Sequence, residues 1–243
     1  MKNLTSVFLF LFTIQVHGSI PKNKPSIEQI LSQTNTHKFS TLKKMGPEVY
    51  KELRKLTFDE SRTLGIRWQA FMAMVRLGEK EAIPEVKEAL NSSDWFLRDA
   101  AIRVLPALDK EVAYKAAIKG LDDSALVVRT TAVDTLGRLG KKECADKLWT
   151  ALYSKDNYIR NQSLWIRKHI VSALADLALP GSEAKFIKVL DDSDSTLFAP
   201  AIAGLERLTG KKLGETQIPP VYRRYYWKKW YKETVSVSKA QAS

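Results

Sequence analysis

Apolar residues recur at helical spacing in the middle of the chain, in segments whose arginines lie 31 residues apart. Counted from each of Arg67, Arg98 and Arg129, the positions three, four, seven and ten residues further on are apolar. Such offsets lie on one face of an α-helix, so each segment predicts a helix with one buried side. The apolar positions are Ala70, Phe71, Met74 and Leu77, then Ala101, Ile102, Leu105 and Leu108, then Ala132, Val133, Leu136 and Leu139.

The pattern continues towards the C-terminus. Arg167 is followed at the same offsets by Ile170, Val171, Leu174 and Leu177, and Phe198 stands 31 residues after Arg167 in the arginine position of a fifth copy. A second helix follows each first one, and Gly78, Asp109 and Gly140 mark the ends of the first helices. A lone helix pair cannot bury its apolar face, so the copies must stack. We therefore predict an all-α fold, an α-α superhelix of about five helix pairs over residues 63–210.

The fourth copy breaks the period. Arg167 follows Arg129 by 38 residues, seven more than the other steps. Seven residues are close to two helical turns and keep a buried face in phase. We therefore expect the first helix of this copy to be about two turns longer at its start, rather than a loop.

The segment from Asp122 to Gly140 resembles the short HEAT repeats of bacterial proteins, the type first associated with phycobilisome lyases. The resemblance covers residues 63–210 and implies the fold, but the family includes scaffolds, lyases and many other proteins. It also implies that the first helix of each pair lines the concave face. Positions one, two and five after the arginine then face outward, at Trp68, Gln69, Asp99, Arg103, Thr130, Asp134, Lys168 and His169. This mixed surface suits a protein or peptide partner; the alternative is an ordinary solvated face.

The N-terminus has the pattern of a secretory signal. Lys2 precedes an apolar run over residues 7–16, and Gly18 ends a cleavage-site pattern. The run is shorter than the roughly 20 residues of a membrane span, so we favour a signal peptide of residues 1–18, cleaved near Gly18, over an anchor. The single cysteine, Cys144, allows no intramolecular disulfide, which fits a bacterial periplasmic or secreted protein. Residues 19–62 are then an N-terminal helical cap.

The repeated arginines Arg67, Arg98, Arg129 and Arg167 have two interpretations. They could grip phosphate, or they could form a structural ladder by bonding to carboxylates or carbonyls of the next copy, such as Asp94, Asp122, Asp123 or Asp156. The net charge of the chain is +12, but residues 65–210 carry 21 basic and 20 acidic side chains. A solenoid around nucleic acid needs a basic inner face, so we favour the ladder and disfavour nucleic acid as a partner.

The basic excess lies at the ends, above all in residues 211–232, with seven basic side chains and one acidic. Tyr222, Tyr226 and Trp230 are spaced for one face of a helix, and we favour a C-terminal cap over residues 211–243 that covers the last copy with these aromatics. The alternative is adhesion to anionic lipid or cell-wall polymer. Its candidate residues are Arg223, Arg224, Trp227, Lys228, Lys229 and Trp230.

Catalytic motifs are missing from the sequence. After the predicted cleavage the chain has two histidines, His37 and His169, and it has no paired His-Glu steps like those of iron-binding HEAT enzymes. We expect no cofactor, no metal and no catalysis. An enzyme such as a lyase or a DNA glycosylase is the less favoured alternative, and for the glycosylase the groove residues would be Trp68, Trp95, Asp99 and Trp165. The sequence thus predicts an exported scaffold that binds a protein or peptide in the cell envelope.

Overall fold

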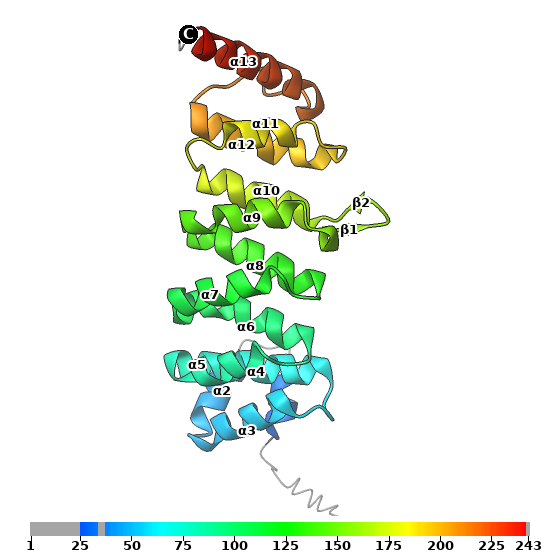
Figure 1. The fold of residues 1–243 in the computed structure, drawn as a ribbon. Helices are drawn as coiled ribbons and strands as arrows, with labels where there is room; N and C mark the ends of the chain where they lie inside the picture. Colours follow the sequence, from blue (N-terminus) through cyan, green and yellow to red (C-terminus); the bar gives the residue numbers. More distant parts are fainter. Residues whose placement is uncertain (1–24, 34–36, 242–243) are drawn as a thin grey trace, which may run out of the picture.

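The chain is an elongated stack of antiparallel helices, as the computed structural model shows (Figure 1). The structure describes residues 25–33 and 37–241, and side chains as far as Thr234. The predicted all-α superhelix is confirmed. The predicted signal peptide of residues 1–18 and its cleavage site lie outside the described residues. Among the helices that are described, none combines the length and the apolar character that a membrane crossing requires.

The first three helices, α1 (Ile27–Leu31), α2 (Lys38–Lys44) and α3 (Glu48–Phe58), pack against the first repeat. Ser26 begins α1 with a capping box, in which its hydroxyl accepts from the Gln29 amide and the Gln29 side chain accepts from the Ser26 amide. In α3 the buried residues Val49, Leu53 and Leu56 recur at helical spacing and face α4.

Five successive copies follow, and the first helix of each packs on the first helix of the next. Two clusters of buried apolar side chains run through the stack and adjoin at Leu90 and Ala116. The core is therefore continuous along the array rather than centred in one place. The helices are α4 (Leu64–Gly78) with α5 (Ile83–Ala89), α6 (Trp95–Leu108) with α7 (Lys110–Gly120), α8 (Leu126–Leu139) with α9 (Ala145–Leu152), α10 (Ile166–Leu177) with α11 (Glu183–Val189), and α12 (Phe198–Thr209) with α13 (Pro220–Gln241).

Local sequence ends these helices in different ways. Gly140 caps α8 in the left-handed region at φ 65°, as expected for glycine. Asp109 ends α6 and also begins α7, where its carboxylate accepts from the amides of Glu111 and Val112. Gly78 has another role: it is the last residue of α4, and a Cβ there would lie 2.6 Å from the ring of Tyr50.

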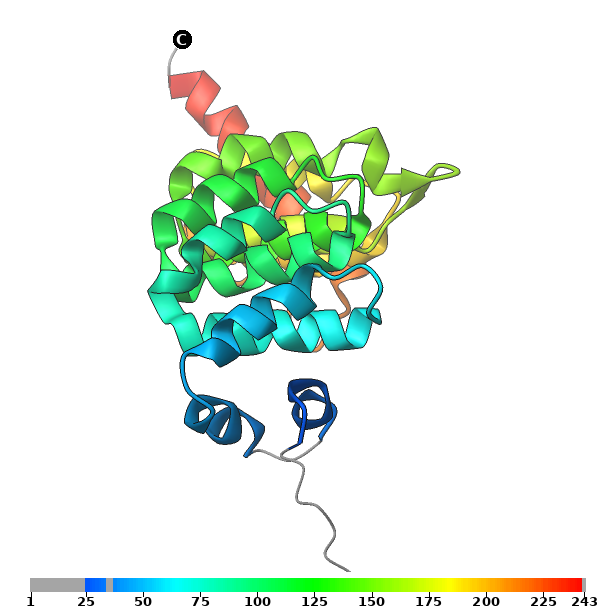
Figure 2. The ribbon, with the colours of Figure 1, turned by 90° about the horizontal axis from the view of Figure 1, so that it is seen from below.

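The seven extra residues of the fourth copy form a β-hairpin, so the predicted extension of its first helix is wrong. A short 3₁₀ turn over Lys155–Asn157 leads into strands β1 (Tyr158–Ile159) and β2 (Gln162–Ser163), and α10 begins only at Ile166. Arg160 and Asn161 join the strands with φ of 49° and 64°, the two left-handed residues of a tight hairpin turn. The hairpin projects from one edge of the stack (Figure 2).

Helix α13 closes the last copy by packing on α11 and α12. The residue that anchors it is Trp227, whose side chain is fully buried, while Trp230 and Tyr231 pack beside it. Tyr222 and Tyr226, expected to cover the edge, are exposed instead. The placement of Trp227 among candidates for an anionic surface was therefore wrong, because its indole belongs to the core.

Candidate functional site

The first helices of copies two, three and four share a groove of about 390 Å³, which we call the first-helix groove. Helices α6, α8 and α10 lie side by side there because each packs on the next. The groove is therefore built from equivalent positions of successive copies. Its lining residues are Arg103, Thr131, Asp134, Gly137, Arg138, His169, Ser172, Ala173 and Asp176.

Asp99 lies beside one end of the groove and holds two of its lining residues in place. Its side chain is almost fully buried, and it accepts a hydrogen bond from the Thr131 hydroxyl at 2.5 Å and from Arg103 Nη2 at 3.0 Å. Arg103 Nη2 also donates to the Thr131 hydroxyl at 2.9 Å. This three-residue cluster ties α6 to α8 and leaves Arg103, about half exposed, at the rim.

Further polar pairs join the first helices of later copies. His169 Nδ1 lies 2.8 Å from Asp134 Oδ1, which joins α10 to α8. Arg207 on α12 forms an ion pair with Asp176 on α10 at 2.8 Å. Charged side chains of the groove thus find partners within the protein, and the surface that remains is close to neutral.

Large aromatic side chains stand exposed near the beginnings of the first helices. Trp68, Trp95 and Trp165 have exposed fractions of 43%, 47% and 51%. Trp95 opens α6 one turn before Asp99, and Trp165 precedes α10 with its ring centroid 5.1 Å from that of His169. Because first helices repeat in the same direction, their N-terminal ends lie along one edge of the array.

A second hollow adjoins Trp165 beside the β-hairpin. It has a volume of about 620 Å³ and lies between the hairpin and the turn that precedes α12. Lys168 lines this hollow rather than the first-helix groove. The other lining residues are Asn161, Gln162, Ser163, Trp165, Ser193, Asp194 and Thr196.

The structure separates the residues that the sequence grouped on the concave face. Arg103, Asp134 and His169 meet in the first-helix groove, whereas Trp68 and Gln69 lie on α4, outside its lining. Gln69 accepts a hydrogen bond from Lys38 Nζ at 3.4 Å. The expectation that Asp99 and Thr130 face outward was wrong.

Asp99 and Thr130 are buried because their polar groups serve the helices themselves. Asp99 holds Arg103 and Thr131, and the Thr130 hydroxyl donates back to the Leu126 carbonyl at 2.9 Å. Neither side chain is placed to meet a partner.

The repeated arginines each reach the loop of the following copy. Arg67 pairs with Asp94 at 2.7 Å, and Arg167 pairs with Asp192 at 2.5 Å. Arg129 donates to the Asp156 carbonyl at 2.6 Å and to the Asn157 side chain at 3.1 Å. These contacts, all between neighbouring copies, are those of a structural ladder.

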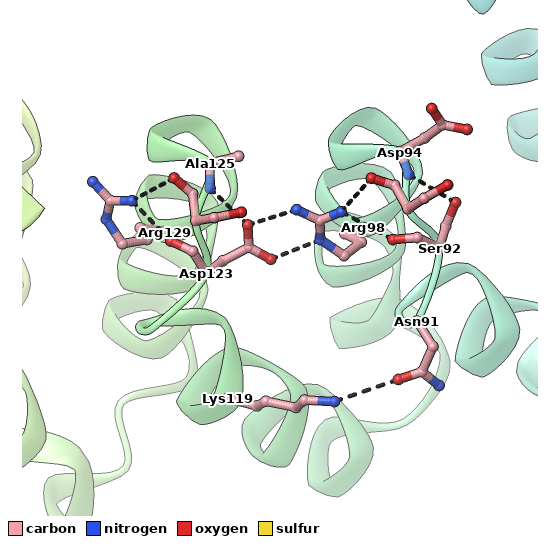
Figure 3. A network of polar contacts seen from close by, with 10 residues as sticks. Asn91, Ser92, Asp94, Arg98, Lys119, Asp123, Ala125 and Arg129 are labelled. Carbon is pink, nitrogen blue, oxygen red and sulfur yellow. Dashed lines mark hydrogen bonds and ion pairs between the residues drawn. The ribbon is translucent and has the colours of Figure 1, made fainter.

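Arg98 shows the geometry of the ladder most completely (Figure 3). Its Nε and Nη2 atoms donate to the two carboxylate oxygens of Asp123 at 2.7 and 2.8 Å, and its Nη1 donates to the Ser92 and Ser93 carbonyls. Burial raises the pKa of Asp123, but the Arg98 hydrogen bonds, the Ala125 amide and the neighbouring positive charges outweigh it, so the pKa is lowered overall. Asp123 is therefore held as a carboxylate, so the contact between Arg98 and Asp123 joins two opposite charges.

A comparison with family models agrees with this architecture. A family model described as HEAT repeats matches residues 83–165. The chain is 32% identical over 108 residues to deoxyhypusine hydroxylase from Danio rerio, a stretch that covers 43% of this chain and 34% of that protein. The chain thus spans about a third of the length of this curated relative. The complex of CpcE and CpcF of phycocyanin lyase from Nostoc sp. PCC7120 contains a similar chain, with 15% identity, a TM-score of 0.43, and coverage of 89% of this chain and 98% of that one.

The chain is a helical solenoid whose residues 83–165 match HEAT repeats. This architecture explains why sequence patterns found the ladder positions and missed two of the exposed tryptophans near the groove. Trp95 and Trp165 stand three and two residues before the solenoid's arginines, outside the offsets used to list outward positions. A helical period run backwards from Asp99 and His169 by one turn would have found both.

Proposed function

We propose that this solenoid is a scaffold that holds a segment of a partner protein along the first-helix groove. The observation that carries the proposal is the pair of half-exposed tryptophans, Trp95 and Trp165, each one helical turn before Asp99 or His169 on a helix of the groove. Tryptophan is among the side chains that contribute most to protein–protein binding when a partner covers it.

The charges of the groove favour a protein partner over a polyanion. Asp134 and Asp176 contribute carboxylates that pair with His169 and Arg207. A phosphate backbone would meet these carboxylates as well as the basic groups, and would gain little attraction. A protein segment with a few apolar side chains and a polar backbone would instead cover the tryptophans and bond to the rim at Arg103.

The exported location belongs to the same proposal. The signal-like residues 1–18 support it, and an exported chain would meet its partner in the cell envelope. Fractionation of cells tests it: we expect the mature chain in the periplasmic or secreted fraction, with its N-terminus near Ser19. If the chain were recovered from the cytoplasm with residues 1–18 still present, the exported location would be contradicted. The proposal for the groove would not be affected.

Site-specific photocrosslinking tests the groove. A benzoylphenylalanine is placed at position 95 and, separately, at position 165, with position 115 on α7 as the control, because Lys115 is exposed on a second helix. We expect one partner protein to crosslink from positions 95 and 165 and not from position 115. The partner is then purified, and Trp95→Ala with Trp165→Ala should weaken its binding. Equal crosslinking from all three positions would overturn the proposal.

A further inference from the structure

A large hollow lies at the far end of the array, between α11 and α13, and we call it the end cleft. Its volume is about 1300 Å³. The lining residues from α13 are spaced by three and four, so they form one stripe of the helix. They are Val221, Tyr222, Arg224, Tyr225, Lys228, Lys229, Lys232 and Glu233, and α11 and its end contribute Ile187 and Asp191.

The end cleft is basic even after its internal pairs are taken into account. Lys228 forms an ion pair with Asp191, and Arg224 donates to the Leu190 carbonyl at 3.4 Å and lies over the Phe198 ring. Lys229 is exposed and has no hydrogen bond or ion pair among the described residues. Four cationic side chains therefore face two carboxylates, and Lys229 is left to meet an anion from outside.

Two tyrosines line the same cleft with their rings in water. Tyr222 and Tyr225 are 66% and 65% exposed, although large aromatic rings usually find cover in a folded protein. The buried side of α13 is already used, because Trp227 fills the core and Trp230 packs beside it. The exposed rings thus belong to a second surface that the cap does not need.

The position of α13 leaves this surface accessible to a large object. The lining side chains of α13 are mostly exposed, and the C-terminal turns of the helix extend past the other helices (Figures 1 and 2). Tyrosine is enriched at the headgroup level of membranes, and a cluster of lysine and arginine on an amphipathic helix is attracted to anionic lipid. We propose that the end cleft docks the protein on an anionic phospholipid surface, with lysines at the phosphates and Tyr222 and Tyr225 among the headgroups.

This docking is peripheral rather than inserted. The apolar side of α13 is buried in the protein, so attraction between charges has to supply most of the binding. Binding should therefore weaken as salt is raised, because exposed charges more than a Debye length apart are screened. The groove for a protein partner lies on other helices, so the two proposals are independent of each other.

Co-sedimentation of the full chain with lipid vesicles tests the proposal. The measured quantity is the increase in binding when phosphatidylglycerol replaces part of the phosphatidylcholine, which removes any contribution that is independent of lipid charge. The test variant is Lys229→Glu with Lys232→Glu. The matched control is Lys115→Glu with Lys147→Glu, which changes the net charge equally on exposed positions of α7 and α9.

We expect the test variant to lose at least about 30-fold in charge-dependent partitioning, because two attractions of about 1 kcal/mol each are removed and two repulsive charges are added. The control should stay within about two-fold of the unmodified chain. Equal loss in both variants would overturn the proposal, as would equal binding to both vesicle types. Soluble polyphosphate serves as the second probe. If the chain bound polyphosphate through these lysines but did not bind the vesicles, its ligand would be a soluble polymer. That result would also overturn the proposal.

Discussion

Arg129 Nε donates to the Asn157 side-chain oxygen at 3.1 Å, and this bond joins the arginine ladder to the inserted segment of the fourth copy. Asn157 is buried, and its amide donates in turn to the Ala151 carbonyl at 2.8 Å. One side chain thus replaces the aspartate that the other copies offer to their arginines. It also fixes the point from which the hairpin leaves the array.

Replacement of Asn157 by alanine should therefore cost about 1–3 kcal/mol of the free energy of unfolding, because it leaves polar groups of a buried network without partners. Urea unfolding followed by circular dichroism measures the change. Asn161→Gly is the control, since glycine also adopts the left-handed conformation at the hairpin tip and should leave the urea midpoint nearly unchanged. An unchanged midpoint for Asn157→Ala would show that the bond to Arg129 contributes nothing.

Arg98→Ala should lower the free energy of unfolding by about 2–4 kcal/mol, because it strands the mostly buried carboxylate of Asp123. The free energy of unfolding of Arg98→Lys should lie between those of the unmodified chain and Arg98→Ala, since lysine keeps the charge and loses the paired geometry. Lys115→Ala, on an exposed surface, should stay within about 0.5 kcal/mol. If Arg98→Ala were as stable as Lys115→Ala, the ladder would have no structural role.

The lowered pKa of Asp123 gives the ladder a pH dependence. The folded pKa lies below the unfolded value of about 3.9, so the stabilisation is present above that pH and is lost as the pH falls through the folded value. Urea midpoints at pH 6 and pH 3 should therefore differ more for the unmodified chain than for Asp123→Asn, which has no proton to bind there. An equal difference in both proteins would assign the acid sensitivity to other groups.

Trp227→Ala should destabilise the protein by about 3–5 kcal/mol, as for other large buried aromatics. Tyr222→Ala should change the stability by no more than about 0.5 kcal/mol, because the Tyr222 ring is mostly exposed. The two substitutions compare the observed cap with the one that helical spacing predicted. A larger effect at Tyr222 than at Trp227 would favour the predicted arrangement.

Burial raises the pKa of the Cys144 thiol to about 11. Little thiolate is then present at pH 8, and the thiolate is the reactive form. Reaction with a disulfide reagent should be slow in the folded protein and should become fast in urea. Fast reaction without urea would mean that the second helix of the third copy opens readily.

The repeat pattern predicted the array because one physical requirement, an apolar face at helical spacing, recurs in all five copies. The insertion could not be found this way. Seven residues fit two helical turns, but Arg160 and Asn161 adopt left-handed φ values, and Asn157 bonds to residues of other segments. The 31-residue period of the sequence predicts neither the left-handed residues nor the bonds of Asn157.

The candidate site was predictable in part for a similar reason. Helical offsets placed Arg103, Asp134 and His169 on one face, and the structure brings them together in the first-helix groove. The same offsets placed Asp99 outward, although the Thr131 hydroxyl on the neighbouring helix draws its carboxylate inward. In the tail, helical spacing favoured Tyr222 and Tyr226, whereas contact with the last copy selects Trp227. Side-chain partners from other copies decide such positions.

The central claim is that the ladder holds the array while the tryptophans at the groove bind the partner. Affinity for the crosslinked partner and the urea midpoint, measured on the same variants, test it most directly. The double variant Trp95→Ala with Trp165→Ala should lose about 100-fold or more in affinity, as expected for two strong interface residues, with little change in midpoint. Arg98→Lys should lower the midpoint and keep the affinity. Unchanged affinity in the double tryptophan variant would contradict the account.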